Sequence, residues 1–422
     1  MSRGASDVNH PARPAPVIVT DGETRPALAA VRSLGARGVP VHVLVEEPPG
    51  LAGASRFATA VHAAPSAEGD PAAWAAALAG LVEQLPGALV LPVTEVSVGT
   101  CFALGLDRSL AIALPPRDAY ETATDKHALL REATACGIPV PRSTLVERAE
   151  TLSGLPPGHA YPVIVKARRS RWLEERGGGS RGVWRRGGLW LARSDADLRR
   201  IAGEPGAQGG VLVQEWVPGG GAGIFFLFDR GTPRARFAHR RLREKPPSGG
   251  VGVLSEAVEP DPALAAKSEA LLRRLGWHGV AMVEFRRATD GRAWLMEVNP
   301  RLWGSLQLAI DAGVDFPAML VALERGGPLP AATPRPGIRT RWLLGDLDRL
   351  WILLRDREQR EAVGQGPLAA LLQFARGFVD GSHEEVLRWS DPRPFAVELR
   401  AWRRALRAAR AKRGSSEPRG LD

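Results

Sequence analysis

The segment Met282–Arg301 constrains the fold more than any other stretch, because two runs of alternating character flank the dipeptide Asp290-Gly291. Asp-Gly between such runs predicts a β-hairpin. With this dipeptide at the turn, Glu284 faces Glu297 across the two strands. The same register pairs the other residues of the hairpin as Thr289 with Arg292, Val283 with Val298, and Phe285 with Met296.

Two facing carboxylates destabilise a hairpin unless a cation compensates for their charge. Asn299 lies two residues beyond Glu297, so its side chain projects from the same face. Carboxylate and amide oxygens are the ligands that hard divalent ions prefer. For an isolated hairpin a solvated charged face is the commoner explanation. Here the ordered set of Glu, Glu and Asn-Pro-Arg favours a metal site once the rest of the chain is considered.

The composition predicts a globular protein of several domains, because 422 residues exceed what one simple core accommodates. No apolar run is long enough to cross a bilayer, and the N-terminus has no apolar signal core, so we expect a cytoplasmic protein without a transmembrane segment. Cys101 and Cys136 lack the spacing of a zinc site or a disulfide framework, and we expect them to be reduced.

The net charge of +10 suggests anionic partners. The basic residues are not interleaved with aromatic ones and no DNA-binding motif is present, so we expect no nucleic-acid partner. Much of the excess charge lies in residues 400–413, RAWRRALRAARAKR. A solvated helical face explains this segment most simply, and contact with a membrane surface or an acidic partner is the alternative.

The order of the elements predicts a Rossmann-like α/β domain over residues 17–113, preceded by a disordered segment over residues 1–16. Its first loop, TDGETR, lacks the GxGxxG fingerprint, so we expect a supporting role. Val93-Thr94-Glu95 follows a predicted strand end, where ligands of open α/β sheets tend to bind. The remaining predicted units are a lobe with a Gly- and Arg-rich loop over 114–210, a lobe with the hairpin over 211–330, and a helical, Arg-rich C-terminal extension over 331–422.

Lysine is rare in this chain, whose basic residues are nearly all arginine. Lysine occurs only at positions 126, 166, 245, 267 and 412, and asparagine only at 9 and 299. A lysine ammonium is a compact charge on a flexible stem, which suits moving phosphate oxygens. The positions of Lys126, Lys166 and Asn299 therefore favour a nucleotide–metal site.

Taken in order, the motifs resemble the ATP-grasp superfamily, whose members are mostly ATP-dependent carboxylate–amine ligases. The resemblance covers residues 17–325 and rests on Thr-Asp-Lys-His at 124–127, VIVKA at 163–167, QEWVPGG at 214–220, VEF at 283–285 and MEVNPR at 296–301. It implies an α/β protein whose two grasp lobes are α+β. The segment FAHRRLREKPPSGGVG at 237–252 is similar to a subgroup of uncharacterised ligases, a carbamoyl-phosphate-synthase-like large-subunit group often linked to polysaccharide biosynthesis.

The resemblance implies a role for each motif residue. The metal ligands, holding Mg²⁺ or Mn²⁺ against the phosphates of ATP, would be Glu284, Glu297 and Asn299. The ATP contacts would be Lys126, Lys166, the hinge residues Glu215, Trp216 and Val217, and the loop glycines Gly178 and Gly179. The catalytic residues would be Arg301, Arg240 and Lys166, and the substrate contacts Arg243, Ser248, Gly249 and Gly250. Glycines 219–221 stand where many members carry an acid for the ribose.

The implied function is an ATP-dependent ligase that activates a carboxylate as an acyl phosphate, releases ADP, and lets an amine displace phosphate to give an amide. Its partners would be a small carboxylate and an amine, and a homodimer is compatible with the sequence. Two alternatives stay open: a carboxylase-like or kinase-like use of the same fold, and a non-catalytic ATP-binding scaffold with an acidic partner. The sequence names neither the acid nor the amine, and it does not identify a general base or a role for residues 331–422.

Overall fold

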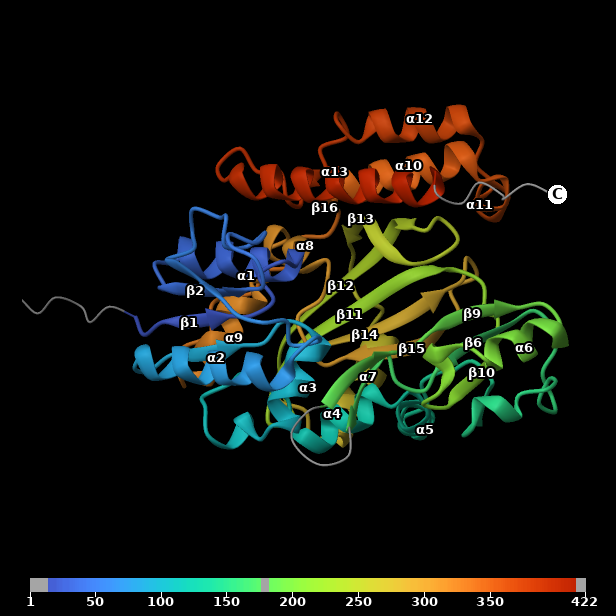
Figure 1. Ribbon diagram of the computed structural model, residues 1–422, viewed down its shortest axis with the longest axis horizontal. Helices are drawn as coiled ribbons and strands as arrows, with labels where there is room; N and C mark the ends of the chain where they lie inside the picture. The colour runs from blue at the N-terminus through green and yellow to red at the C-terminus, as the bar shows by residue number, and fades with distance from the viewer. Residues whose placement is uncertain (1–13, 176–181, 415–422) are drawn as a thin grey trace, which may run out of the picture.

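The structure is a computed structural model that describes residues 14–175 and 182–414 (Figure 1). It contains a parallel sheet in the N-terminal domain, a four-stranded antiparallel sheet in the first lobe, and a long, mostly antiparallel sheet that the C-terminal helices cover. Within the described residues no helix has the length and apolarity needed to cross a membrane.

The N-terminal domain is a four-stranded parallel sheet in the order β3-β2-β1-β4. Its strands are β1 (Val17–Val19), β2 (Val41–Val45), β3 (Ala60–Ala63) and β4 (Leu89–Leu91), and its helices are α1 (Arg25–Ala36), α2 (Pro71–Gln84) and α3 (Glu95–Ala103). The predicted strand–helix–strand unit is confirmed: Thr24 caps α1, and β1 and β2 pair in parallel. Residues 1–13 of the predicted disordered segment lie outside the described residues. Ala15 and Pro16 are ordered, because their carbonyls accept hydrogen bonds from Arg325.

The first lobe holds a four-stranded sheet in the order β5-β10-β6-β9. Its elements are α4 (Arg117–Thr124), α5 (Lys126–Ala135), β5 (Ser143–Val146), β6 (Val163–Ala167), β9 (Leu189–Ala192), α6 (Asp195–Ala202) and β10 (Val211–Glu215), with a separate hairpin of β7 (Arg171–Glu175) and β8 (Gly182–Arg186). A lobe boundary between residues 210 and 211 is therefore wrong. β10 pairs with β5 and β6, so the first lobe extends through Glu215.

The second lobe is a seven-stranded sheet in the order β15-β14-β11-β12-β13-β16-β17. Its main elements are β11 (Gly220–Asp229), β12 (Thr232–Lys245), β13 (Val251–Ala257), α7 (Pro262–Arg274), β14 (Gly279–Arg287), β15 (Ala293–Asn299), α8 (Leu306–Asp311) and α9 (Phe316–Glu324). One buried apolar cluster joins this sheet to the N-terminal domain. Trp303 packs at its centre, with its ring centroid 4.3 Å from that of Phe225 and 4.9 Å from that of Phe316.

The C-terminal region, residues 331–422, was predicted to be helical, but it also contains two short strands. It supplies β16 (Arg339–Arg341) and β17 (His383–Glu384) to the long sheet, and the helices α10 (Leu343–Arg355), α11 (Arg357–Val363), α12 (Pro367–Arg376) and α13 (Arg393–Gly414). Figure 1 shows α10, α12 and α13 above β12 and β13. Buried Asp391 accepts from Arg32 of α1 at 2.9 Å and from Ser55 at 2.6 Å. This region is therefore tied both to the second lobe and to the N-terminal domain.

Candidate functional site

The hairpin of β14 and β15 places Glu284 opposite Glu297 and Val283 opposite Val298, as predicted. The turn is different from the predicted one. Ala288 rather than Thr289 bonds with Arg292, and the amide of Gly291 donates to the carbonyl of Ala288, so the loop has three residues, 289–291. Gly291 has a φ of 88°, the left-handed conformation that such a loop requires.

The longer loop shifts the pairing by one residue, so Phe285 faces Leu295 and not Met296. A bulge at Met296 on β15, opposite Glu284 and Phe285, then leaves Met296 unpaired and restores the predicted register at the carboxylates. The facing pair was therefore predicted correctly, although the pairs nearer the turn were not. Asn299 pairs with Met282 at the end of the ladder, and its amide nitrogen donates to Glu297 Oε1 at 3.0 Å.

The two facing carboxylates are half-buried and have different electrostatic surroundings. Burial raises the pKa of Glu284, and the negative charge of Glu297 raises it further, against the lowering effect of Arg241. Burial also acts to raise the pKa of Glu297, but the charges of Lys126 and Lys166 and the hydrogen bond from Asn299 outweigh it and lower that pKa below its usual value. Two facing acids in one half-buried site favour a further cation beside them.

Both predicted lysines lie at this site. Lys166, on β6, is 7% exposed, and burial together with the positive charge of Lys126 lowers its pKa to about 8. The acids Glu297 and Glu284 act in the opposite direction. Lys126, at the start of α5, donates from Nζ to Ser170 Oγ at 2.8 Å. Residues from three separate segments of the chain thus bring two ammonium groups to two carboxylates.

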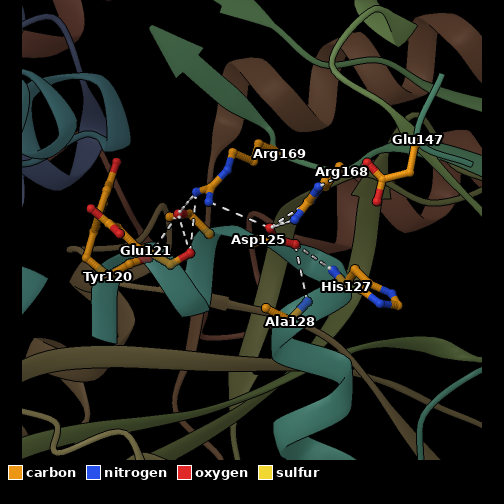
Figure 2. A network of polar contacts seen from close by, with 9 residues as sticks. Tyr120, Glu121, Asp125, His127, Ala128, Glu147, Arg168 and Arg169 are labelled. Atoms are coloured by element: carbon orange, nitrogen blue, oxygen red, sulfur yellow. Dashed lines mark hydrogen bonds and ion pairs between the residues drawn. The ribbon is translucent and has the colours of Figure 1, made fainter. Parts of the chain in front are cut away.

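The position of Lys126 is fixed by the network around Asp125 (Figure 2). The Asp125 side chain caps α5 by accepting from the backbone amides of His127 and Ala128 at 3.1 and 3.2 Å. Arg168 donates to the same carboxylate at 2.7 Å. Arg169 donates to Thr124 Oγ1 at 2.8 Å and lies 3.7 Å from Asp125. These two arginines therefore hold the start of α5 in place.

Arg301 follows β15 and lies beside the metal-ligand candidates. Its Nη2 donates to Asn299 Oδ1 at 3.0 Å, and its Nη1 to the carbonyl of Leu302 at 2.8 Å. The Asn299 amide thus links the guanidinium of Arg301 to the carboxylate of Glu297. A guanidinium held in this way is suited to stabilising developing negative charge.

The predicted catalytic residue Arg240 and the predicted substrate contact Arg243 do not reach the facing carboxylates. Arg240 turns away to Glu256, with Nε 2.7 Å from Oε2, and Arg243 is buried against Asp346 of α10 at 2.6 Å. Arg241 takes their place: it donates to Glu284 at 2.7 Å and to Glu244 at 3.2 Å. The pairing of β12 with β13 skips Leu242, and this bulge turns Arg243 to the opposite face from the one that simple alternation predicts.

The other predicted contacts are distributed around the site. The hinge Glu215 accepts at Oε1 from the amide of Arg142 at 2.9 Å, Trp216 is 49% exposed, and Val217 is buried. Gly250 lines a large cavity that is described below. Ser248 is exposed, and its backbone amide donates a hydrogen bond to the side-chain oxygen of Gln359 at 3.1 Å. Gly249 lies near Arg286, because a Cβ there would come within 3.1 Å of Arg286 Nη1. Gly178 and Gly179 lie outside the described residues.

A cavity of about 1530 Å³ opens on the facing carboxylates. It reaches from Glu284, Glu297, Asn299 and Arg301 past the carboxyl ends of β1 and β4 to Trp342 and α13. The segments that follow β1 and β4 of the Rossmann-like domain line part of this cavity. Ligands of open α/β sheets bind at such strand ends, so this domain contributes to the site.

Besides Arg241, three residues of the site had no role assigned to them from the sequence, although Glu95 belongs to the segment Val93-Thr94-Glu95 that was noted for its place after a strand end. Glu95, at the first turn of α3, has its pKa raised by burial and lowered in part by Arg301 and Lys126. Asp21, with a φ of 58°, follows β1 and accepts from Ser97 at 2.6 Å and Thr94 at 2.9 Å. Both follow strand ends, which was the available signal. Arg286, two residues beyond Glu284, has a buried Nε without a partner among the described residues.

The donor set fits a divalent cation bound together with phosphate. Among the described residues no group of three or more His, Cys, Asp or Glu side chains could hold a metal alone. Glu284, Glu297 and Asn299 supply oxygen ligands, and Mg²⁺ is typically completed by water and substrate phosphates. The nearby ammonium groups of Lys126 and Lys166 suit those phosphates.

Comparison with known proteins supports the same fold. Residues 211–345 match the family model described as "ATP-grasp in the biosynthetic pathway with Ter operon". No curated protein matches the sequence.

Among solved structures, N5-carboxyaminoimidazole ribonucleotide synthetase from Thermus thermophilus is 21% identical, with a TM-score of 0.57 over 76% of this chain and 82% of that one. The biotin carboxylase domain dimer of Hydrogenobacter thermophilus 2-oxoglutarate carboxylase, in complex with MgADP, ADP and bicarbonate, is 14% identical, with a TM-score of 0.59 over 77% and 73%. L-amino acid ligase from Bacillus licheniformis is 16% identical, with a TM-score of 0.57 over 78% and 79%.

Proposed function

We propose, from an ATP-grasp fold whose second lobe matches an ATP-grasp family model, that this protein is an ATP-dependent ligase that joins a carboxylate to an amine. One observation carries the proposal: two half-buried facing carboxylates, Glu284 and Glu297, share a site with two lysines and Arg301. Similar solved structures include an L-amino acid ligase and a carboxylase domain that binds MgADP. The narrower link to polysaccharide biosynthesis stays a prediction, since the matching family model names a different context.

Each residue of the site has a part in this chemistry. Glu284, Glu297 and Asn299 would hold Mg²⁺, and Lys126 and Lys166 would neutralise phosphate oxygens. Bound ATP with Mg²⁺ would supply the phosphoryl group that converts a carboxylate to an acyl phosphate. Arg301, oriented by Asn299, would stabilise the negative charge on the transferred group. Burial of these groups excludes water, which strengthens their charges and protects an acyl phosphate from hydrolysis.

A matched set of assays tests the ligase function. Carboxylates are screened against amines with ATP and Mg²⁺ by coupled ADP release, and the amide product is identified by mass spectrometry. The proposal requires ADP release that depends on both the acid and the amine. Release that needs only the acid would instead support a kinase-like or carboxylase-like reaction. Tight ATP binding without turnover on any pair would support a scaffold. The cytoplasmic location and a homodimer stay predictions.

The affinity for MgATP is expected to fall as the pH rises above about 8. Burial lowers the pKa of Lys166 to about 8 in the free protein, whereas bound phosphates would stabilise its ammonium form. Above that pH, binding must therefore take up a proton, and the affinity should drop by about tenfold per pH unit. The measurement is the dissociation constant of MgATP by calorimetry from pH 7 to pH 10.

Lys166→Arg is the matched control, because a guanidinium stays protonated over this range. Its dissociation constant should vary much less with pH. An equally steep profile in Lys166→Arg would show that Lys166 does not cause the pH dependence.

A further inference from the structure

Four arginines of α13 form one face of the helix and line the central cavity. Arg400, Arg403, Arg404 and Arg407 are spaced i, i+3, i+4 and i+7, which places them on one side of an α-helix. They span about 10 Å along the helix axis. We call this set the arginine ladder. The four residues are exposed, as the simplest sequence explanation of a solvated helical face predicts, and they also border the same cavity as the facing carboxylates.

The arginine ladder has no counter-charge of its own. All four side chains belong to exposed residues, and within the described part of the chain none of them forms an ion pair. Many other arginines of the protein are paired, including Arg25 with Glu385 and Arg171 with Glu68 at the same cavity. Four guanidinium groups on one face repel one another unless an anion lies between them.

The N-terminal domain contributes several acidic residues to the lining of the cavity. Glu23, Glu46, Glu47 and Glu68 of the N-terminal domain line it, at and beyond the carboxyl ends of the parallel strands. An anionic group inside the cavity is therefore repelled by these acidic residues and attracted by α13. The volume of about 1530 Å³ also exceeds the roughly 300–1000 Å³ of ordinary small-molecule sites. The cavity can hold a substrate that extends from the carboxylates to the ladder.

We propose that the arginine ladder binds the anionic end of the substrate, a small molecule that carries several phosphate or carboxylate groups distant from the reacting carboxyl group. This deepens the proposed ligase function and rests on it. Arginine suits the task because its planar fork binds phosphate and carboxylate oxygens in pairs. The ladder then fixes the long axis of the substrate, while Arg301 and the facing carboxylates act at the other end. The basic C-terminal helix thereby becomes part of the specificity of the site.

Calorimetry with two probes, inorganic tripolyphosphate and citrate, tests this in the full-length protein with saturating MgADP. The quadruple variant Arg400→Gln, Arg403→Gln, Arg404→Gln and Arg407→Gln should bind the preferred probe at least about tenfold more weakly than the wild type. Its affinity for MgADP should not change. Arg393→Gln is the matched control, because Arg393 is exposed on the same helix and does not line the cavity among the described residues. It should bind like the wild type. The probe that binds with the higher affinity shows whether the arginine ladder prefers phosphate or carboxylate groups.

Three results would overturn the proposal. They are equal affinity in the quadruple variant and the wild type, an equal loss in Arg393→Gln, and tighter ladder-dependent binding of duplex DNA or of anionic lipid vesicles than of either probe. A quadruple Arg→Lys variant keeps the positive charges but removes the guanidinium forks, and its thermal unfolding temperature shows that it still folds. If it binds the preferred probe as the wild type does, the arginine ladder acts through charge; if it binds more weakly, the forks also contribute. Failure of MgADP to bind at all would count against the ligase function, whereas binding of the probes can still be measured without nucleotide.

Discussion

Replacing Glu297 with glutamine is expected to lower substrate-dependent ADP formation by about two to three orders of magnitude. Glu297 faces Glu284 across the hairpin and is bonded to Asn299, so it is central to the proposed cation site. Glutamine keeps the shape and one oxygen but loses the charge that a divalent ion needs. The same variant should lose most of the gain in ATP affinity that Mg²⁺ produces. This second readout needs no known acid or amine.

The stability of Glu297→Gln should stay within about 1 kcal/mol of the wild type. The change removes repulsion from Glu284, and it also removes attraction to Lys126 and Lys166 that lowers the pKa of Glu297. These effects oppose each other. Glu269→Gln, which removes an exposed partner of Arg236 on the far α7 helix, is the control and should keep full activity. Near-normal ADP formation by Glu297→Gln would show that the facing carboxylates do not hold the metal.

Replacing Asp346 with alanine is expected to destabilise the protein by about 3–5 kcal/mol, because among the described residues it leaves the buried Arg243 without an ion-pair partner and Arg341 with only Glu384, at 3.7 Å. Asp346 Oδ2 lies 2.6 Å from Arg243 Nη1 and 2.8 Å from Arg341 Nε. Asp346 is 1% exposed and Arg341 is fully buried. Arg341 also lies over the rings of Phe374 and Phe378, so the cluster joins β12 and β16 to α10 and α12. Chemical denaturation followed by circular dichroism measures the change.

Glu361→Ala is the control for this experiment. Its partner Arg357 lies 2.7 Å away on the exposed face of α11, with 84% and 63% of the two side chains accessible. Loss of such a pair should cost at most about 0.5 kcal/mol. A similar small change in Asp346→Ala would mean that water reaches the cluster and that it does not hold the C-terminal helices to the sheet.

The facing carboxylates show how far local sequence rules reach. Alternation and the Asp-Gly turn identified Glu284 and Glu297 as partners, and the structure confirms this pair. The turn itself was wrong by one residue, and the bulge at Met296 compensated. An error of one residue in the turn shifts the pairing along the whole strand. The predicted pairing is therefore recovered only beyond a second irregularity, such as this bulge.

The arginines of β12 show where local sequence rules no longer predict the site. Arg240, Arg241 and Arg243 are chemically alike and lie within four positions, so composition cannot select among them. Alternation places Arg240 and Arg241 on opposite faces, and a bulge at Leu242 turns Arg243 away from the face of Arg241, so only Arg241 meets Glu284. Bulges have no strong sequence signature, because the extra residue is tolerated wherever the neighbouring sheet can bend.

The sequence by itself determined the βαβ unit of the N-terminal domain, the carboxylate pair and the rare lysines that accompany it. These depend on periodicity and on residue chemistry, both of which are local. Tertiary structure alone decided that β10 belongs to the first lobe, that residues 339–341 and 383–384 complete the long sheet, and that α13 closes the cavity. Each of these depends on pairing or packing between segments distant in the chain. Such contacts are selected by the burial of whole faces against one another, which no single segment encodes.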